Sequence, residues 1–309
     1  MISLFTIITL FSVYLAIFLF GMTVMRTGLL QLSENRTKDY IRHFTDHPIK
    51  GMIVGAVITA LLQSSSAVMV ITVGLVAAGY LTFYQSIGIM LGSNIGTTLT
   101  TELITLDISN YVLPLLLIGF FCLFSKRKLP FSIGSSIFGL GCLFVAMKGF
   151  EGLALPLSLY SNVQDFLLLT NEHHFIGVIL GTIITAMIHS SSATVGISMS
   201  FLNNELLSLP AGIAIMLGSN IGTCVTAYMA SFGGIKEAKL TAYAHIWLNI
   251  FGVLIFFPLI PLLSNFVEAL AANADVQLAH SSVIFNLVCS FIALPFVKPF
   301  SRFIEKLHR

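Results

Sequence analysis

Two short polar runs in this chain share a pattern, and their residue types suit the binding of an oxyanion. The run at 59–67 reads TALLQSSSA, and the run at 185–193 reads TAMIHSSSA. Each offers serine hydroxyls and backbone N–H groups as hydrogen-bond donors, together with one amide or imidazole. If a helix begins at the serines, its free N–H groups and its dipole also favour an anion.

A second pair of motifs suits a cation. The sequence IMLGSNIGT occupies both 89–97 and 215–223, and its carbonyl, amide and hydroxyl oxygens are ligands for a hard cation. An anion and a cation held side by side neutralise each other in a medium of low dielectric constant. Together, the two pairs of motifs predict ion-coupled transport of an anion.

Both pairs belong to one internal duplication. Residues 51–106 align with residues 177–232 without a gap at an offset of 126, and 23 of the 56 aligned positions are identical. A repeat of this kind predicts two structural copies of one unit. We place the first repeat at 1–129 and the second at 130–309, which includes an appended C-terminal span at 282–297.

Composition identifies the medium in which the chain folds. Hydrophobic residues make up 56% of the sequence, charged residues 9%, and the mean hydropathy is +0.96, whereas a soluble domain has about 25% charged residues. We therefore expect a multi-pass protein of the lipid bilayer, and no basic patch suggests nucleic acid. Single cysteines in apolar segments predict neither disulfides nor metal ligands; they are Cys122, Cys142, Cys224 and Cys289.

Apolar stretches of roughly spanning length predict about seven transmembrane helices in an all-α fold. They lie at 4–25, 83–106, 108–125, 131–150, 208–232, 240–263 and 282–297. Two of them, 83–106 and 208–232, contain the GSNIG sequence, whose residues have low helix propensity. We expect these two to be broken helices.

The stretches 51–79 and 177–202 differ, because a polar tract interrupts each near its middle. Each arm has about 11 residues and a length of about 16 Å as a helix, half of a roughly 30 Å hydrocarbon core. This length predicts two re-entrant helical hairpins whose Gln/His-Ser-Ser-Ser tips lie at the midplane. A single straight span through each tract is the alternative.

The distribution of basic residues favours the hairpins. With seven crossings and an external N-terminus, the C-terminus is cytoplasmic, and the cytoplasmic loops hold 14 of the 15 Lys and Arg residues; these loops are 26–50, 126–128, 236–239 and 298–309. The opposite loops, including 151–176 and 264–280, carry no Lys or Arg, in agreement with the positive-inside rule. The two hairpins then open to opposite sides, as in the inverted repeats of secondary transporters.

The paired QSSS-like tracts, each followed by GSNIGT, resemble the type II sodium/phosphate cotransporter family, in particular its short bacterial members. The resemblance covers 51–106 and 177–232. It implies sodium-coupled transport of inorganic phosphate by alternating access, with Na⁺ as the coupling ion and neither a cofactor nor a catalytic residue. The chain departs from the family at His189, where glutamine is usual, so the sodium stoichiometry and the pH response do not carry over.

The resemblance also implies site residues. The predicted phosphate ligands are Gln63, Ser64, Ser65, Ser66, His189, Ser190, Ser191 and Ser192. The predicted sodium ligands are Gln63, Ser64, Asn94, Thr97, Thr98, Ser190, Asn220 and Thr223. Glu102 is an accessory candidate for the cation and Lys148 for guiding the anion, whereas we expect Arg26 to anchor the first span at the cytoplasmic surface.

Alternatives from the same residues stay open. The same fold suits another oxyanion or a small carboxylate, and the direction of transport is undetermined. An intramembrane serine hydrolase would pair a serine of 190–192 with His189 or His245, although neighbours along a helix do not face each other. A non-transporting membrane subunit is a further alternative. The sequence also leaves open a homo-oligomer and a separate regulatory protein, since related proteins often carry a regulatory domain where this chain ends at Arg309.

Overall fold

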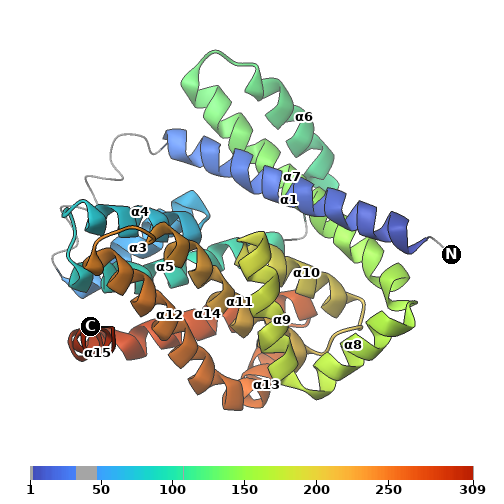
Figure 1. The fold of residues 1–309 in the computed structure, drawn as a ribbon. Coiled ribbons are helices and arrows are strands. Elements are labelled where there is room, and N and C mark those ends of the chain that lie inside the picture. The colour runs from blue at the N-terminus through green and yellow to red at the C-terminus, as the bar shows by residue number, and fades with distance from the viewer. Residues whose placement is uncertain (1–2, 33–46, 107, 309) are drawn as a thin grey trace.

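The computed structural model describes residues 3–32, 47–106 and 108–308, and this part of the chain is helical, without strands (Figure 1). The predicted all-α class is confirmed. The helices are α1 (Leu4–Leu32), α3 (Pro48–Leu62), α4 (Ser65–Ala77), α5 (Phe83–Ile104), α6 (Val112–Leu123), α7 (Lys128–Ser158), α8 (Ser161–Glu172), α9 (His174–Ile188), α10 (Ser191–Asn203), α11 (Leu209–Ala230), α12 (Lys236–Phe256), α13 (Ile260–Leu270), α14 (Ala274–Ala293) and α15 (Val297–Leu307), with short 3₁₀ turns at Ser109–Tyr111, Phe257–Leu259 and Leu294–Phe296.

Within the described residues, five helical segments are long and apolar enough to cross a membrane, or six if the bent pair α8–α9 counts as one span. Two of the seven predicted spans do not meet this standard. Helix α6 has only 12 residues, which extend about 18 Å. Helix α5 has 22 residues but is not among the segments that meet this standard.

Segments predicted as loops are also helical. Helix α7 continues to Ser158, and α8, α13 and α15 occupy parts of the predicted loops 151–176, 264–280 and 298–309. These segments are amphipathic: α15, for example, buries Val297, Ser301 and Ile304 at intervals of four and three residues. Such helices pack one face and leave the other exposed. The predicted loop 26–50 begins inside α1, and its residues 33–46 lie outside the described residues.

Both polar tracts break their helices, so neither 51–79 nor 177–202 is one continuous helix. Gln63 (φ 50°) and His189 (φ 57°) adopt the left-handed conformation and end α3 and α9. Ser64 and Ser190 follow in extended conformation and cap α4 and α10. The sequence supports this break because a serine side chain satisfies the free N–H groups of a new helix.

The predicted breaks in 83–106 and 208–232 are absent: α5 and α11 are continuous through both GSNIG sequences. The glycines there serve close helix packing instead. A Cβ at Gly92 would lie 2.7 Å from the backbone nitrogen of Ala56 on α3, and a Cβ at Gly218 would lie 2.7 Å from the carbonyl carbon of Val178 on α9. Small residues permit this approach of helix backbones in membranes.

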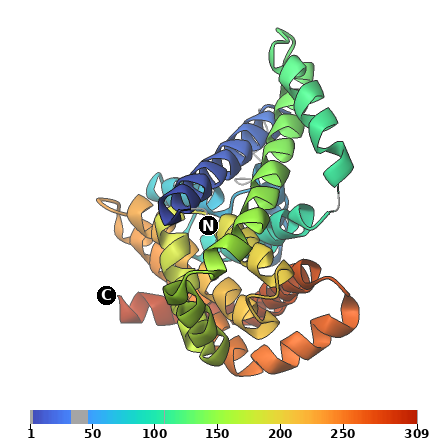
Figure 2. The same cartoon turned by 90° about the vertical axis from the view of Figure 1, so that its right-hand side faces the viewer.

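Packing groups the helices into matched pairs. Helix α5 packs along α3, and α11 packs along α9, its counterpart in the second copy. Helices α1, α6 and α7 form a separate group to one side of the other helices, in which α7 lies between α1 and α6 (Figures 1 and 2). The largest buried cluster draws most of its residues from α1, α7, α10, α11, α13 and α14.

Candidate functional site

The two polar tips line one cavity of about 110 Å³. All eight predicted phosphate ligands contribute to it, four from each copy. Among the described residues, its lining consists of Leu19, Met22, Thr23, Arg26, Gln63, Ser64, Ser65, Ser66, Thr97, His189, Ser190, Ser191 and Ser192. Segments 126 positions apart in sequence thus lie together in space.

The backbone at each tip presents hydrogen-bond donors. The Ser64 hydroxyl accepts from the Ala67 N–H at 3.2 Å, and the Ser190 hydroxyl accepts from the Ala193 N–H at 3.2 Å. These caps use the third N–H of each helix and leave the first two without an intrahelical acceptor. Those two belong to serines of the tips, so the cavity receives free N–H groups from two helix N-termini, a setting that favours an anion.

Gln63 and His189 occupy equivalent positions but differ in their surroundings. The Gln63 amide donates to the Ala60 carbonyl and accepts from Thr100 Oγ1 at 2.7 Å, and the residue is 4% exposed. The equivalent threonine of the second copy, Thr226, instead donates to the carbonyl of its own helix. His189 is exposed. The first tip is therefore held by the hydrogen bonds of its amide, whereas the imidazole of the second tip has no such bond to the equivalent threonine.

Arg26 lines the cavity with the two tips, a position that the sequence analysis missed. It lies within α1 and is partly buried, whereas the sequence analysis assigned it only the role of an anchor for the first span, and that role stays a prediction. Its Nε atom is buried and has no hydrogen-bond partner in the described part of the protein. The sequence signal was weak, because Arg26 stands 37 positions before Gln63 and follows a long apolar run, as flanking charges do.

The predicted sodium ligands outside the tips are dispersed. Thr97 lines the cavity, but Thr98, Asn220 and Thr223 do not. Their polar side chains bond within their own helices: Thr98 Oγ1 to the Ile95 carbonyl at 2.7 Å, Asn220 Nδ2 to the Met216 carbonyl at 2.9 Å and Thr223 Oγ1 to the Ser219 carbonyl at 2.8 Å. A hydroxyl that donates in this way keeps its oxygen lone pairs available for a cation.

Asn94 faces another side of α5. It lines a separate, largely apolar cavity of about 330 Å³ between α5, α12 and α14. Its Nδ2 donates to Asn249 Oδ1 at 3.4 Å, and Asn249 Nδ2 in turn lies 3.3 Å from Cys224 Sγ. Asn94 therefore joins α5 to α12 in this structure and does not contact the tips.

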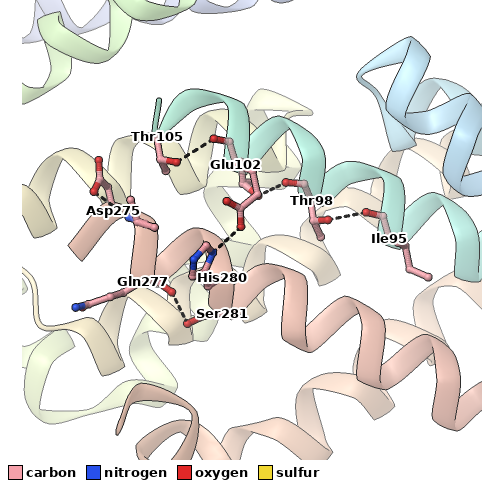
Figure 3. Close-up of polar contacts among 10 residues, drawn as sticks. Ile95, Thr98, Glu102, Thr105, Asp275, Gln277, His280 and Ser281 are labelled. Atoms are coloured by element: carbon pink, nitrogen blue, oxygen red, sulfur yellow. Dashed lines mark hydrogen bonds and ion pairs between the residues drawn. The ribbon is translucent and has the colours of Figure 1, made fainter. Parts of the chain in front are cut away.

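Glu102 and Lys148, the two accessory candidates, both lie outside the lining of the tip cavity. Glu102 Oε1 lies 2.9 Å from His280 Nδ1, so that the carboxylate of α5 reaches α14 (Figure 3). Both side chains of this pair are about one third exposed, at 30% and 34%. Lys148 on α7 is exposed.

The geometry gives no support to a serine nucleophile activated by histidine. In the described residues, no hydrogen bond joins a tip serine to His189 or to His245, and His245 is buried away from the tip cavity. The cysteines are free thiols. Among the described residues, no group of three or more His, Cys, Asp or Glu side chains could hold a metal ion.

Comparison with known proteins identifies the family. The profile of the Na⁺/Pi-cotransporter family matches residues 17–152 and 154–274. The chain is 40% identical over 298 residues to the uncharacterized protein YqeW of Bacillus subtilis, covering 96% of this chain and 97% of that protein. The chain belongs to the Na⁺/Pi-cotransporter family.

Two further relatives carry functional names. The putative inorganic phosphate export protein YjbB of Escherichia coli is 25% identical over 296 residues, which are 95% of this chain and 54% of that protein. The sodium-dependent phosphate transport protein 2A of Oryctolagus cuniculus is 42% identical over 60 residues, 19% of this chain and 9% of that protein. No solved structure matches the chain.

Proposed function

We propose that this chain is a secondary transporter that moves inorganic phosphate across the cell membrane together with Na⁺ by alternating access. The observation that carries the proposal is the single cavity lined by both serine tips. Free helix N–H groups, hydroxyls and a guanidinium converge there, and all of them can donate to the oxygens of a tetrahedral anion. The family and the names of two relatives support phosphate as that anion.

Alternating access follows in this proposal from two inverted repeats, 1–129 and 130–309. The repeats match locally in detail: both tips have a left-handed residue, a capping serine and a continuous glycine-containing helix after the hairpin. Inverted repeats let the two halves exchange roles across the membrane plane, so a site at their interface opens to either side. The N-terminus would be external and the C-terminus cytoplasmic.

Sodium binding is proposed at the edge of the same cavity. Thr97 brings a hydroxyl oxygen from α5 into the lining beside Gln63 and Ser64, and such neutral oxygens suit Na⁺. In this arrangement the cation offsets part of the phosphate charge inside the membrane, where an unpaired charge is costly. No cofactor takes part, and the remaining predicted sodium ligands would reach the ion only in another conformation.

Flux of radiolabelled phosphate in proteoliposomes tests this function. We expect uptake to follow an inward Na⁺ gradient and to fall to the level of empty liposomes when K⁺ replaces Na⁺. Unlabelled sulfate, arsenate and small carboxylates should be added in turn, because competition by one of these without phosphate flux would assign the fold to another anion. No accumulation of any anion would contradict transport and favour a non-transporting subunit.

A further inference from the structure

We infer that Arg26 is the charged ligand of the transported anion and determines that the substrate is an oxyanion with a full negative charge. This inference deepens the proposed function and rests on it. Helix α1 contributes one wall of the cavity. Leu19, Met22, Thr23 and Arg26 follow one another at helical spacing and all line it, so one face of α1 closes the space between the two tips.

The permanent charge in the described lining is positive. Of the described lining residues, Arg26 alone carries a permanent charge, and no carboxylate is among them. The ion pair of Glu102 with His280 lies outside this lining. A partly buried cation without a counter-ion in the described lining is costly, and a bound anion would reduce that cost.

The hydrogen-bond inventory leads to the same class of ligand. A guanidinium has only donors, arranged in a planar fork that matches two oxygens of phosphate or carboxylate. Its Nε is buried without an acceptor in the described part of the chain. The tip N–H groups are donors as well, so the missing component is an acceptor with several oxygens. Uncharged polyols, which bring their own donors, do not fit this set.

Arg26 also breaks the symmetry of the site. The tips are copies of each other, but the matching basic residue of the second repeat, Lys148, is exposed on α7 and does not line the cavity. One repeat therefore supplies the positive charge for a site that both repeats build. Helix α1 therefore contributes a charged interaction with the anion that the duplicated tips do not supply.

Calorimetric titration of the purified protein with phosphate at saturating NaCl tests this inference. We expect Arg26→Gln to weaken phosphate binding about ten-fold or more, because a charge-assisted hydrogen bond is lost, and Arg26→Lys to recover part of that loss. Arg127→Gln is the matched control, since Arg127 is an exposed arginine outside the cavity. Elution as a monodisperse peak should be the same for all variants.

A KM measurement in proteoliposomes separates ligand contact from a structural role. We expect the KM for phosphate to rise in Arg26→Gln, while the half-saturating Na⁺ concentration at saturating phosphate changes little. Unchanged phosphate affinity in a folded Arg26→Gln protein would overturn the inference while leaving the proposed function intact. If wild type binds sulfate or another anion in place of phosphate and Arg26→Gln loses it, the inference stands and the proposed substrate is wrong. If wild type binds no anion tested, both are wrong.

Discussion

At the scale of single residues, the tips show how the same sequence serves different purposes in the two copies. Gln63 is tied to Ala60 and Thr100, whereas His189 at the equivalent position has no such tether to Thr226. Both nevertheless adopt the same left-handed conformation, which costs a non-glycine residue about 1 kcal/mol or more. The conserved backbone geometry shows that the turn, and not the side chain, is what the duplication has kept.

We expect Ser65→Ala and Ser191→Ala each to raise the KM for phosphate several-fold, because each removes one donor from the cavity and leaves its helix N-terminus capped. The several-fold rise in KM corresponds to a loss of about 1 kcal/mol of binding free energy, the usual contribution of one hydrogen bond. Initial rates of phosphate uptake in proteoliposomes measure it. Ser135→Ala is the control, since that hydroxyl bonds only the Phe131 carbonyl of its own helix. Normal uptake by both tip variants would remove the serines from the site.

At the scale of helices, the sequence indicated the breaks at the two polar tracts correctly but misjudged α5 and α11. Three consecutive serines interrupt a helix visibly, because serine caps a new helix better than it continues an old one. Glycine is ambiguous: the same low helix propensity accompanies a break and a close contact between two helices. The position of α3 against Gly92 decides between a break and a close contact. No local sequence pattern contains that position.

Replacing Gly92 with alanine should destabilise the protein by about 1–3 kcal/mol, the usual range for an overpacked interior, because the new Cβ meets backbone atoms of α3. Thermal unfolding in detergent measures the effect, and the loss of the monodisperse peak is its readout. Gly74→Ala on α4 is the matched control, since nothing lies within 4 Å of its added Cβ. An increase in the unfolding temperature for both variants would show that α3 and α5 are not in close contact.

At the scale of the whole molecule, charge counting predicted an orientation, and the site was only partly predictable. The eight residues predicted as phosphate ligands line one cavity, and the duplication is what singled them out in the sequence; their binding of an anion stays a prediction. The sequence analysis missed Arg26, since a basic residue at the end of an apolar run is normally a membrane anchor. It also grouped Asn94 with the tips, although α5 turns that side chain toward α12. Both errors concern which face of a helix looks inward, a property of tertiary packing.

The proposed inverted arrangement predicts opposite accessibility of two loops. In a variant without its natural cysteines, a cysteine at position 126, between α6 and α7, should react with a membrane-impermeant maleimide only after the cells are opened. A cysteine at position 205, after α10, should react in intact cells. Labelling of both positions after permeabilisation is the control. Reaction of position 126 in intact cells would contradict the predicted orientation.

The glycine contacts described above also bear on how such a molecule could move. Where backbone lies directly on backbone, as between α3 and α5 and between α9 and α11, even small relative sliding brings peptide groups into collision. We therefore expect each of these pairs to move as one rigid body. Any rearrangement that changes the face to which the cavity opens has to take place at the seams between the pairs, where flexible side chains can exchange partners.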